Sequence, residues 1–532
     1  MPNLTIDGQA VAVPVGATIL DAARLLGIEI PTLCHRAGCR PETSCLVCVV
    51  RVNGSGRLVP SCATPAAEGM VVESETDEVL EARRTALELL FGDHLGDCLA
   101  PCQMTCPAGL NIPDMLRLLD AGRMTEAVAL VKRRIPLPAI VGRICAANCE
   151  RGCRRAQLDS AIQIACLEQQ VGDYDLQAET PYRPLVPPAT GMRIAVVGSG
   201  LVGLTAAWML RREGHVVTIM EPGERLGGEL LAMPEGQLPA AVREAEIQRV
   251  LDLGIEVRLQ AAAEPDAVAQ QYDAVVWTSP LDEQVTLAEK VFAVATPDHA
   301  ARAVASGREV AREISAHLRG EASPEPHRPF TVHMRRLEAE ELQCMSDCRA
   351  GARTPPQPLS ATARTAGYKP PPYSGEAVRC LECDCTEPDT CAPPQPDSAT
   401  TPAGYEPPPY SGEAARCLKC DCTEPDTCAL RRWAAAYAVQ PRRFAGHERK
   451  FELNETHPLI VFEAGKCIAC GLCVQIAERY CEPLGLAFIG RGFTVRPGVP
   501  WDETLAEGLQ RAARECAEAC PTAALSLRGP LQ

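Results

Sequence analysis

Cysteine is the residue type whose number and spacing indicate chemistry in this sequence. The chain has 28 cysteines among 532 residues, and most of them stand in short-spaced groups separated by long stretches without cysteine. Secreted disulfide-rich domains are small and carry evenly spread cysteines, so they do not match this pattern. Grouped thiolates are typical of metal ligands in a reducing compartment. We therefore expect several metal or iron–sulfur centres and a cytoplasmic location.

The first group has the spacing Cys34-x10-Cys45-x2-Cys48-x13-Cys62. Four thiolates from one loop and a returning strand suit a [2Fe–2S] cluster. A tetrahedral zinc site is the alternative, although zinc sites seldom use so wide a first gap. Cys39 completes neither pattern, and we interpret it as a spare thiol.

The residues before this loop predict the elements that hold it. Apolar and polar residues alternate on both sides of Asp7-Gly8, which predicts a hairpin turn. Thr18 begins a helical pattern that ends at Gly27. Two strands and a helix are therefore expected before the cysteine loop.

Two cysteine triplets follow an amphipathic helix that is expected over 78–94. Neighbouring cysteines within each triplet are separated by three residues, so they could share a helical face. Two triplets far apart in sequence more simply make interleaved cluster loops. The triplets are Cys98, Cys102, Cys106 and Cys145, Cys149, Cys153.

An internal repeat with a period of 37 residues carries further cysteines. AGYKPPPYSGEAVRCLECDCTEPDTCA returns as AGYEPPPYSGEAARCLKCDCTEPDTCA, and only the second copy continues into a predicted helix, ALRRWAAAYAV. Each copy has four closely spaced thiolates, which bind either a [4Fe–4S] cluster or zinc. The repeat cysteines are Cys380, Cys383, Cys385, Cys391, Cys417, Cys420, Cys422 and Cys428.

The C-terminal region carries C-x2-C-x2-C and a distant Cys-Pro, a strong bacterial-type [4Fe–4S] signature. A second cluster would need a second triplet, but only Cys516 precedes the Cys-Pro pair. We expect one cluster, with Cys481 and Cys516 left over. Its ligands are Cys467, Cys470, Cys473 and Cys520.

MRIAVVGSGLVGLTAAWMLRREGHVVTIME reads as strand, glycine turn, helix and strand. Gly198 and Gly200 let the backbone approach a pyrophosphate, and Gly203 lets the helix pack on the strand. Glu221 ends the second strand, where an acid can bind ribose hydroxyls. The combination predicts a dinucleotide-binding Rossmann fold.

The overall charge excludes some partners. A formal net charge of −16 argues against nucleic acid, which requires clustered Lys and Arg. An acidic surface can steer a basic redox partner. MPNLTIDGQA has no export signal, and no run of about 18 apolar residues predicts a membrane span.

The two ends of the chain resemble one known protein family. Residues 3–75, including SCATP around Cys62, resemble the N-terminal ferredoxin domain of the large iron–sulfur subunit of respiratory complex I and of related formate dehydrogenases. The C-terminal region, with GLAFIGRGF between its cysteine groups, resembles the same subunit. This resemblance implies a β-grasp fold with a [2Fe–2S] centre. That subunit also starts its next cluster with His-x3-Cys, as His94 and Cys98 do here.

The middle of the chain resembles a second family. APCQMTCPAGLNIP, GRIC and AIQIACLEQQ are similar to the N-terminal domain of the glutamate synthase small subunit and of dihydropyrimidine dehydrogenase. The resemblance implies a helical domain with two [4Fe–4S] clusters whose ligands cross. By position, one cluster would take Cys98, Cys102 and Cys153. The other would take Cys106, Cys145, Cys149 and Glu168.

Two ligand positions of this resemblance stay open. The first cluster lacks a fourth ligand, because Leu95 stands near the place of the family's cysteine. His94 is the nearest candidate, although a lone histidine is as often a surface residue. Cys166 competes with Glu168, which the resemblance favours.

The glycine-rich segment resembles the FAD domain of the same family through RLGGEL, and KVFAVATPDHAARAVASGREVAREI resembles the end of that domain. The family's NADPH-binding domain is missing, because no second glycine fingerprint occurs. Thr296-Pro297-Asp298 replaces a Gly-Asp that contacts the flavin chain, and the residues 277–280 replace a small-residue turn. FAD binding and a scaffold without cofactor both stay open.

These patterns predict a multidomain protein that combines α+β and α/β parts. The expected segments are a [2Fe–2S] β-grasp ferredoxin (1–80), a helical double-cluster domain (81–190), a truncated FAD-type Rossmann domain (191–320), a linker (321–365), tandem Cys-rich repeats (366–432), a connector (433–455) and a bacterial-type [4Fe–4S] ferredoxin domain (456–532).

The functional expectation is an iron–sulfur electron-transfer subunit, with FAD, within a larger cytoplasmic oxidoreductase. Its partners would be other redox subunits, catalytic or NAD-binding, in a hetero-oligomer. One alternative is a self-contained NAD(P)H-linked flavin oxidoreductase similar to the glutamate synthase small subunit. Another is a non-redox metal-binding scaffold. No nucleophile–base motif is present, so no catalytic residue is named.

Overall fold

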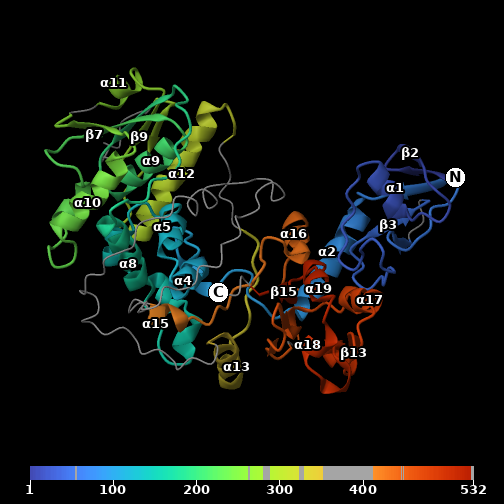
Figure 1. Cartoon of the computed structure of the whole chain (residues 1–532). Helices are drawn as coiled ribbons and strands as arrows, with labels where there is room; N and C mark the ends of the chain where they lie inside the picture. The colour runs from blue at the N-terminus through green and yellow to red at the C-terminus, as the bar shows by residue number, and fades with distance from the viewer. Residues whose placement is uncertain are drawn as a thin grey trace. The chain divides into compact units, whose positions relative to one another are not determined.

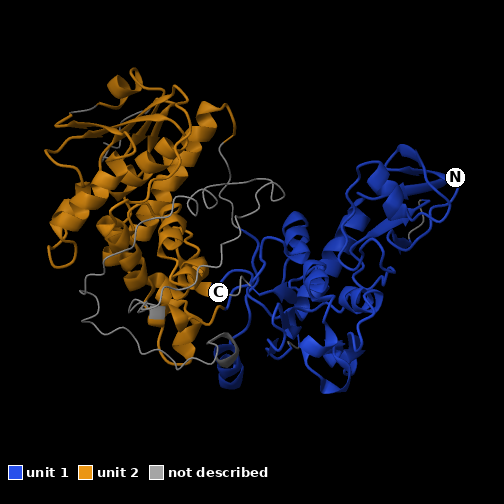
Figure 2. Cartoon of the chain, viewed as in Figure 1, with its two compact units in different colours: residues 1–100, 328–351, 420–532 blue, residues 101–327, 352–419 orange. Residues whose placement is uncertain are grey.

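The structure is a computed structural model that describes residues 1–53, 57–261, 264–278, 288–322, 329–350, 411–444, 446 and 449–528. The chain forms two compact units, which are coloured separately in Figure 2. Unit 1 comprises 1–100, 328–351 and 420–532, and unit 2 comprises 101–327 and 352–419. The expected ferredoxin regions at the two ends of the chain therefore share a unit. The first Cys-rich repeat lies outside the described residues.

Unit 1 begins with a five-stranded sheet in the order β2-β1-β5-β3-β4, of which β2 and β3 are labelled in Figure 1. The expected hairpin turns at Asp7 and Gly8, both at positive φ. Thr18 caps α1 (Ile19–Leu25) through a capping box with Asp21, and Gly27 follows at positive φ. The strands are β1 (Asn3–Ile6), β2 (Gln9–Ala12), β3 (Val49–Val52), β4 (Leu58–Pro60) and β5 (Met70–Glu73).

The rest of unit 1 contains the helix expected over 78–94, which is α2 (Asp77–Gly92), and the C-terminal region. Strands β11 (Leu453–Asn454), β12 (Ile460–Glu463) and β15 (Leu525–Leu527) form a three-stranded sheet, and β13 (Ala487–Ile489) pairs with β14 (Arg496–Gly498). The helices of this region are α16 (Ala429–Ala436), which is the helix predicted after the second repeat, α17 (Leu472–Arg479), α18 (Leu505–Gly508) and α19 (Ala513–Glu518).

The described part of the expected linker has structure of its own. It ends in α13 (Ala339–Ala350), in which Leu342 and Met345 are buried. Val332 and Met334 are also buried. Sequence reasoning overlooked their alternation because many Pro, Ala and Arg residues surround it. The segment 329–350 packs as part of unit 1.

Unit 2 begins with helices that contain Cys102, Cys149 and Cys166, and Cys106, Cys145 and Cys153 directly follow or lie close to helix ends. Helices α6 and α8 cross closely, because a Cβ at Gly142 would lie 2.4 Å from the Gln169 nitrogen and one at Gly172 would lie 2.2 Å from the Ala139 nitrogen. The helices are α3 (Pro101–Thr105), α4 (Ile112–Asp120), α5 (Met124–Lys132), α6 (Pro138–Ile144), α7 (Asn148–Arg151), α8 (Ile164–Gln177) and α15 (Ser411–Ala415).

The remainder of unit 2 confirms the expected Rossmann-like fold. Five parallel strands follow the order β10-β9-β6-β7-β8. The glycine turn joins β6 to α9, and Glu221 ends β7. The elements are β6 (Arg193–Val197), α9 (Leu201–Arg212), β7 (Val216–Glu221), α10 (Ala240–Leu251), β8 (Glu256–Leu259), α11 (Pro265–Ala269), β9 (Ala274–Trp277), β10 (Val291–Ala293) and α12 (Ala300–Leu318).

The described helices include none that combines the length and the apolar character needed to cross a membrane.

Candidate metal centres

The four cysteines predicted to hold a [2Fe–2S] cluster lie together as two close pairs. The sulfurs of Cys34 and Cys45 are 3.3 Å apart, and those of Cys48 and Cys62 are 3.4 Å apart. All four side chains are buried. The sulfur–sulfur hydrogen bond within each pair lowers the pKa of one thiol, Cys34 to about 6 and Cys48 to about 7, and raises the pKa of the other, Cys45 and Cys62, well above the usual range. Four buried, converging sulfurs fit a [2Fe–2S] cluster.

The four C-terminal cysteines predicted as cluster ligands line one cavity, which is also lined by Cys516. They are Cys467, Cys470, Cys473 and Cys520. The Ala469 N–H donates to the Cys467 sulfur over 3.3 Å, and the Leu525 N–H donates to the Cys520 sulfur over 3.4 Å. Such N–H···S bonds stabilise thiolates. The four thiols predicted as ligands, with Cys470 and Cys473 among them, fit a [4Fe–4S] cluster.

Cys516 is a fifth thiol at this cavity, which sequence reasoning had left over. Its side chain is fully buried, and its sulfur donates to the Cys473 carbonyl oxygen over 3.6 Å. Cys516 lies on α19, four residues before Cys520, and this spacing was the signal in the sequence that places it at the same cavity. Cys481, the other leftover thiol, is exposed.

In unit 2, Glu168 lies among the three cysteines that the family resemblance grouped with it. Burial raises the pKa of Cys106 to about 11, and the charges of Glu168 and Cys145 add to that effect. Glu168 and Cys106 also raise the pKa of Cys149 beyond the effect of burial.

One oxygen of the Glu168 side chain lacks a hydrogen-bond partner. The side chain is buried, its Oε1 has no hydrogen-bond partner, and burial raises its pKa to about 8. An orphaned buried oxygen beside three thiols fits a fourth cluster ligand. Cys166, the competing candidate, instead lies 3.8 Å from the Gln170 amide nitrogen.

The remaining cysteines of the two triplets belong to different units. Cys102 on α3 lies near Cys153, since a Cβ on Gly152 would lie 3.1 Å from the Pro101 carbonyl oxygen. Cys98 belongs to unit 1, where a parallel bridge pairs its neighbour Asp97 with Asp421.

That bridge brings Cys98 beside the second half of the repeat. Cys98, Cys422 and Cys428 are all buried, and Cys98 packs in one hydrophobic cluster with Cys428. Burial raises the pKa of Cys428 to about 12, and the charges of Cys422 and Cys98 contribute. The three thiols therefore form one group within unit 1.

His94 lies next to this group. Its ring packs edge-on against Phe91, and its buried Nδ1 has no hydrogen-bond partner. Burial lowers the pKa of His94 to about 4, so the ring is neutral, which is the form that binds metals. Lys466 interacts with both His94 and Cys98.

Within the described ranges, no three His, Cys, Asp or Glu side chains are arranged to hold a single metal ion. The thiols meet as pairs and wider groups.

The Rossmann-like part of unit 2 has a cleft of about 680 Å³ above the glycine turn. Gly198, Gly200, Glu221 and Trp277 line it. The size lies within the usual range of small-molecule sites. A Cβ on Gly203 would lie 2.1 Å from the Gly198 carbonyl oxygen, so the third glycine is needed for packing.

Glu229 occupies the place at the helix N-terminus where a pyrophosphate would bind. Its Oε1 accepts a hydrogen bond from the Leu201 N–H over 2.8 Å, and a Cβ on Gly200 would lie 2.0 Å from its Oε2. An anion already fills the cradle, so the residues as arranged do not fit the pyrophosphate of FAD. The acid in RLGGEL was the signal that sequence reasoning missed.

Glu221 is also engaged by its own chain. Its carboxylate accepts hydrogen bonds from the backbone N–H groups of Ser199 (2.9 Å) and Gly223 (2.8 Å) and from the Ser199 hydroxyl. The Glu221 carboxylate is therefore not free to bind the ribose hydroxyls, which is the role predicted from the sequence.

Comparisons with known proteins match three parts of the chain. A 2Fe-2S iron–sulfur cluster binding domain matches residues 2–77. Dihydropyrimidine dehydrogenase domain II, a 4Fe-4S cluster domain, matches 93–180. An NAD(P)-binding Rossmann-like domain matches 196–236. These matches support clusters and give no support to zinc.

Curated relatives cover parts of the chain as well. It is 31% identical over 202 residues to the NADP(+)-dependent formate dehydrogenase subunit beta of Moorella thermoacetica, covering 33% of this chain and 29% of the relative. It is 52% identical over 104 residues to the NADP-reducing hydrogenase subunit HndD of Solidesulfovibrio fructosivorans, covering 19% and 18%. It is 46% identical over 98 residues to a subunit of the NADH-quinone oxidoreductase of Rhizobium meliloti, covering 18% and 12%.

The chain spans less than a third of the length of each of these relatives. They are named as subunits of oxidoreductases, and the predicted resemblance to iron–sulfur oxidoreductase subunits is confirmed.

Proposed function

We propose that this chain is an iron–sulfur electron-transfer subunit of a larger oxidoreductase. One observation carries the proposal: cysteines from three ligand groups pack in one hydrophobic cluster of unit 1. They are Cys34 and Cys45, Cys98 and Cys428, and Cys470. Iron–sulfur clusters supply one-electron carriers, and neighbouring ligand groups place such carriers close together.

The C-terminal ligand group lies next to both other groups of unit 1. Arg40, in the first cysteine loop, donates its N–H to the Gln475 side chain on α17 over 2.7 Å, and Cys470 interacts with Cys34. On its other side, the Leu430 N–H donates to the Pro521 carbonyl oxygen over 3.1 Å, beside Cys520. We propose that the C-terminal cluster is the middle one of the three.

We leave FAD out of the proposed cofactors, because Glu229 fills the cradle of the Rossmann-like part. This also weakens the alternative of a self-contained NAD(P)H-linked flavin oxidoreductase. The relatives include no sign of a non-redox scaffold. The partners we propose are other redox subunits, and the thiolate groups require a reducing environment.

The test is the content of iron, acid-labile sulfide, zinc and flavin in protein purified without oxygen. We expect about 18 iron atoms from the described sites, with equal sulfide, as one [2Fe–2S] and four [4Fe–4S] clusters require. The first repeat would add about four more if it also holds a cluster.

Two results would contradict the proposal. About two iron atoms with several zinc ions per chain would indicate a structural protein. About one flavin per chain that NAD(P)H bleaches would indicate the flavin oxidoreductase.

A further inference from the structure

The second Cys-rich repeat changes units partway through its cysteines. Residues up to 419 belong to unit 2, and residues from 420 belong to unit 1. Cys417 is therefore in one unit, whereas Cys420, Cys422 and Cys428 are in the other. A single four-thiolate site, as the spacing predicted, does not match this division.

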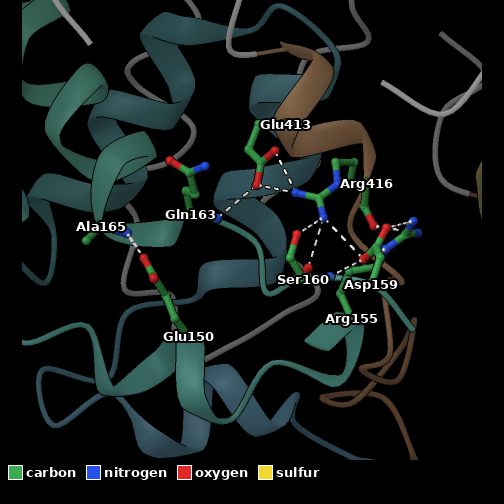
Figure 3. A network of polar contacts seen from close by, with 8 residues as sticks. All are labelled: Glu150, Arg155, Asp159, Ser160, Gln163, Ala165, Glu413 and Arg416. Carbon is green, nitrogen blue, oxygen red and sulfur yellow. Dashed lines mark hydrogen bonds and ion pairs between the residues drawn. The ribbon is translucent and has the colours of Figure 1, made fainter. Parts of the chain in front are cut away.

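A buried ion network fixes residues 413–416, directly before Cys417, on the helical part of unit 2 (Figure 3). The guanidinium of Arg416 donates to Glu413 (2.7 Å), to the Ser160 carbonyl oxygen (2.9 Å) and to Asp159 (3.2 Å). Glu413 also accepts from the Gln163 N–H over 3.0 Å. The side chains of Arg416 and Glu413 are 2% and 0% exposed. Buried charges with this many partners hold one geometry.

The network brings Cys417 toward Cys153. Arg155, two residues after Cys153, donates to the carbonyl oxygen of Arg416 over 3.4 Å, and Arg416 directly precedes Cys417. Arg155 also interacts with the Cys153 thiol. Figure 3 shows Arg155, Asp159 and Arg416 converging at this place. Cys102 lies near Cys153 through the contact of Gly152 with α3.

The backbone at Cys417 has the turn of a cluster-binding loop. Lys419 has a positive φ of 45°, and its N–H donates to the Cys417 sulfur over 3.3 Å. In the C-terminal signature, Ala469 has a φ of 51°, and its N–H donates to the Cys467 sulfur over the same distance. A non-glycine residue at positive φ is uncommon, so the same turn in both loops indicates that both loops have to present a cysteine sulfur in the same way.

We propose that the second repeat is divided between two clusters. Cys417 is a ligand of the [4Fe–4S] cluster that takes Cys102 and Cys153 in unit 2, and it supplies a thiolate that residues 81–190 lack. Cys422 and Cys428 bind a separate [4Fe–4S] cluster with Cys98 in unit 1. This inference rests on the proposed iron–sulfur function and goes beyond it by reassigning the ligands.

The test is the additivity of cluster loss in the full chain. We expect C417S and C422S each to lose about four iron atoms, and the double variant to lose about eight, because the two residues serve different clusters. Iron, sulfide and the electron paramagnetic resonance (EPR) spectrum of the dithionite-reduced protein are measured. C481S, which removes an exposed thiol, is the matched control and keeps all its iron. An unchanged [2Fe–2S] signal shows that each variant is folded.

A double variant that loses no more iron than either single variant would place both cysteines at one cluster and overturn the division. A single variant that keeps all its iron would also overturn it. Both results differ from failure of the proposed function, in which the unmutated chain itself lacks the clusters.

Discussion

Glu168 is a buried carboxylate oxygen donor among thiols. If it is a cluster ligand, E168A should lose about four iron atoms, since removing a ligand weakens the binding of the whole [4Fe–4S] cluster. Iron, sulfide and EPR intensity after reduction measure the loss. C166S, which changes the neighbouring thiol, should keep its iron. The reverse pattern would assign the ligand to Cys166.

Glu229 acts on the cleft through its charge at the N-terminus of α9. Removing it in E229A exposes the N–H groups of the glycine turn, so ADP should bind at least about tenfold more tightly than to the unmutated chain. Isothermal titration with ADP and with FAD measures the change. E224A, an exposed glutamate five residues earlier, is the control. Equal affinities of E229A and the unmutated chain would show that Glu229 does not block the cleft.

Helices α6 and α8 depend on two glycines where they cross. G172A should destabilise unit 2 by about 1–3 kcal/mol, because the new methyl group would meet the backbone of Ala139 at 2.2 Å. Thermal unfolding followed by circular dichroism measures this. G236A is the control, since a Cβ there meets nothing within 4 Å. An unchanged melting temperature for G172A would mean that the helices separate easily.

Elements were predictable from the sequence where local patterns determine them. The hairpin at Asp7-Gly8, the cap at Thr18 and the strand–turn–helix around Gly198 all depend on residues within a few positions of one another. The packing of Val332 was not predictable, because it depends on residues of α2 and α16 that are distant in sequence.

At the scale of the whole molecule, the proposed middle position of the C-terminal cluster has a magnetic consequence. C473S, which removes a proposed ligand of that cluster, should slow the spin relaxation of the reduced [2Fe–2S] centre. Neighbouring paramagnets relax each other, and Cys470 interacts with Cys34. EPR power saturation measures the effect, with C481S as control. Identical saturation in C473S and the unmutated chain would remove the C-terminal cluster from that position.

The grouping of ligands was not predictable from the sequence, because it depends on contacts between residues that are far apart in the chain. Spacing suggests which cysteines bind metal, but it cannot show that Cys98 lies beside Cys422, because more than 300 residues separate them and 101–327 belong to the other unit. The near-identity of the two repeats also favoured a self-contained site. The buried contacts of Arg416 hold the segment before Cys417 on unit 2, whereas the bridge from Asp97 to Asp421 holds the following cysteines in unit 1.

The bridge between Asp97 and Asp421 has a consequence for biosynthesis. Every ligand proposed for the [2Fe–2S] centre has been synthesised once Cys62 is made. Cys98 must wait until residues 99–421 have been translated before its partners exist. Domains generally fold as they are synthesised. If Cys98 shares a cluster with Cys422 and Cys428, as we propose, that cluster can be completed only late in the synthesis of the chain.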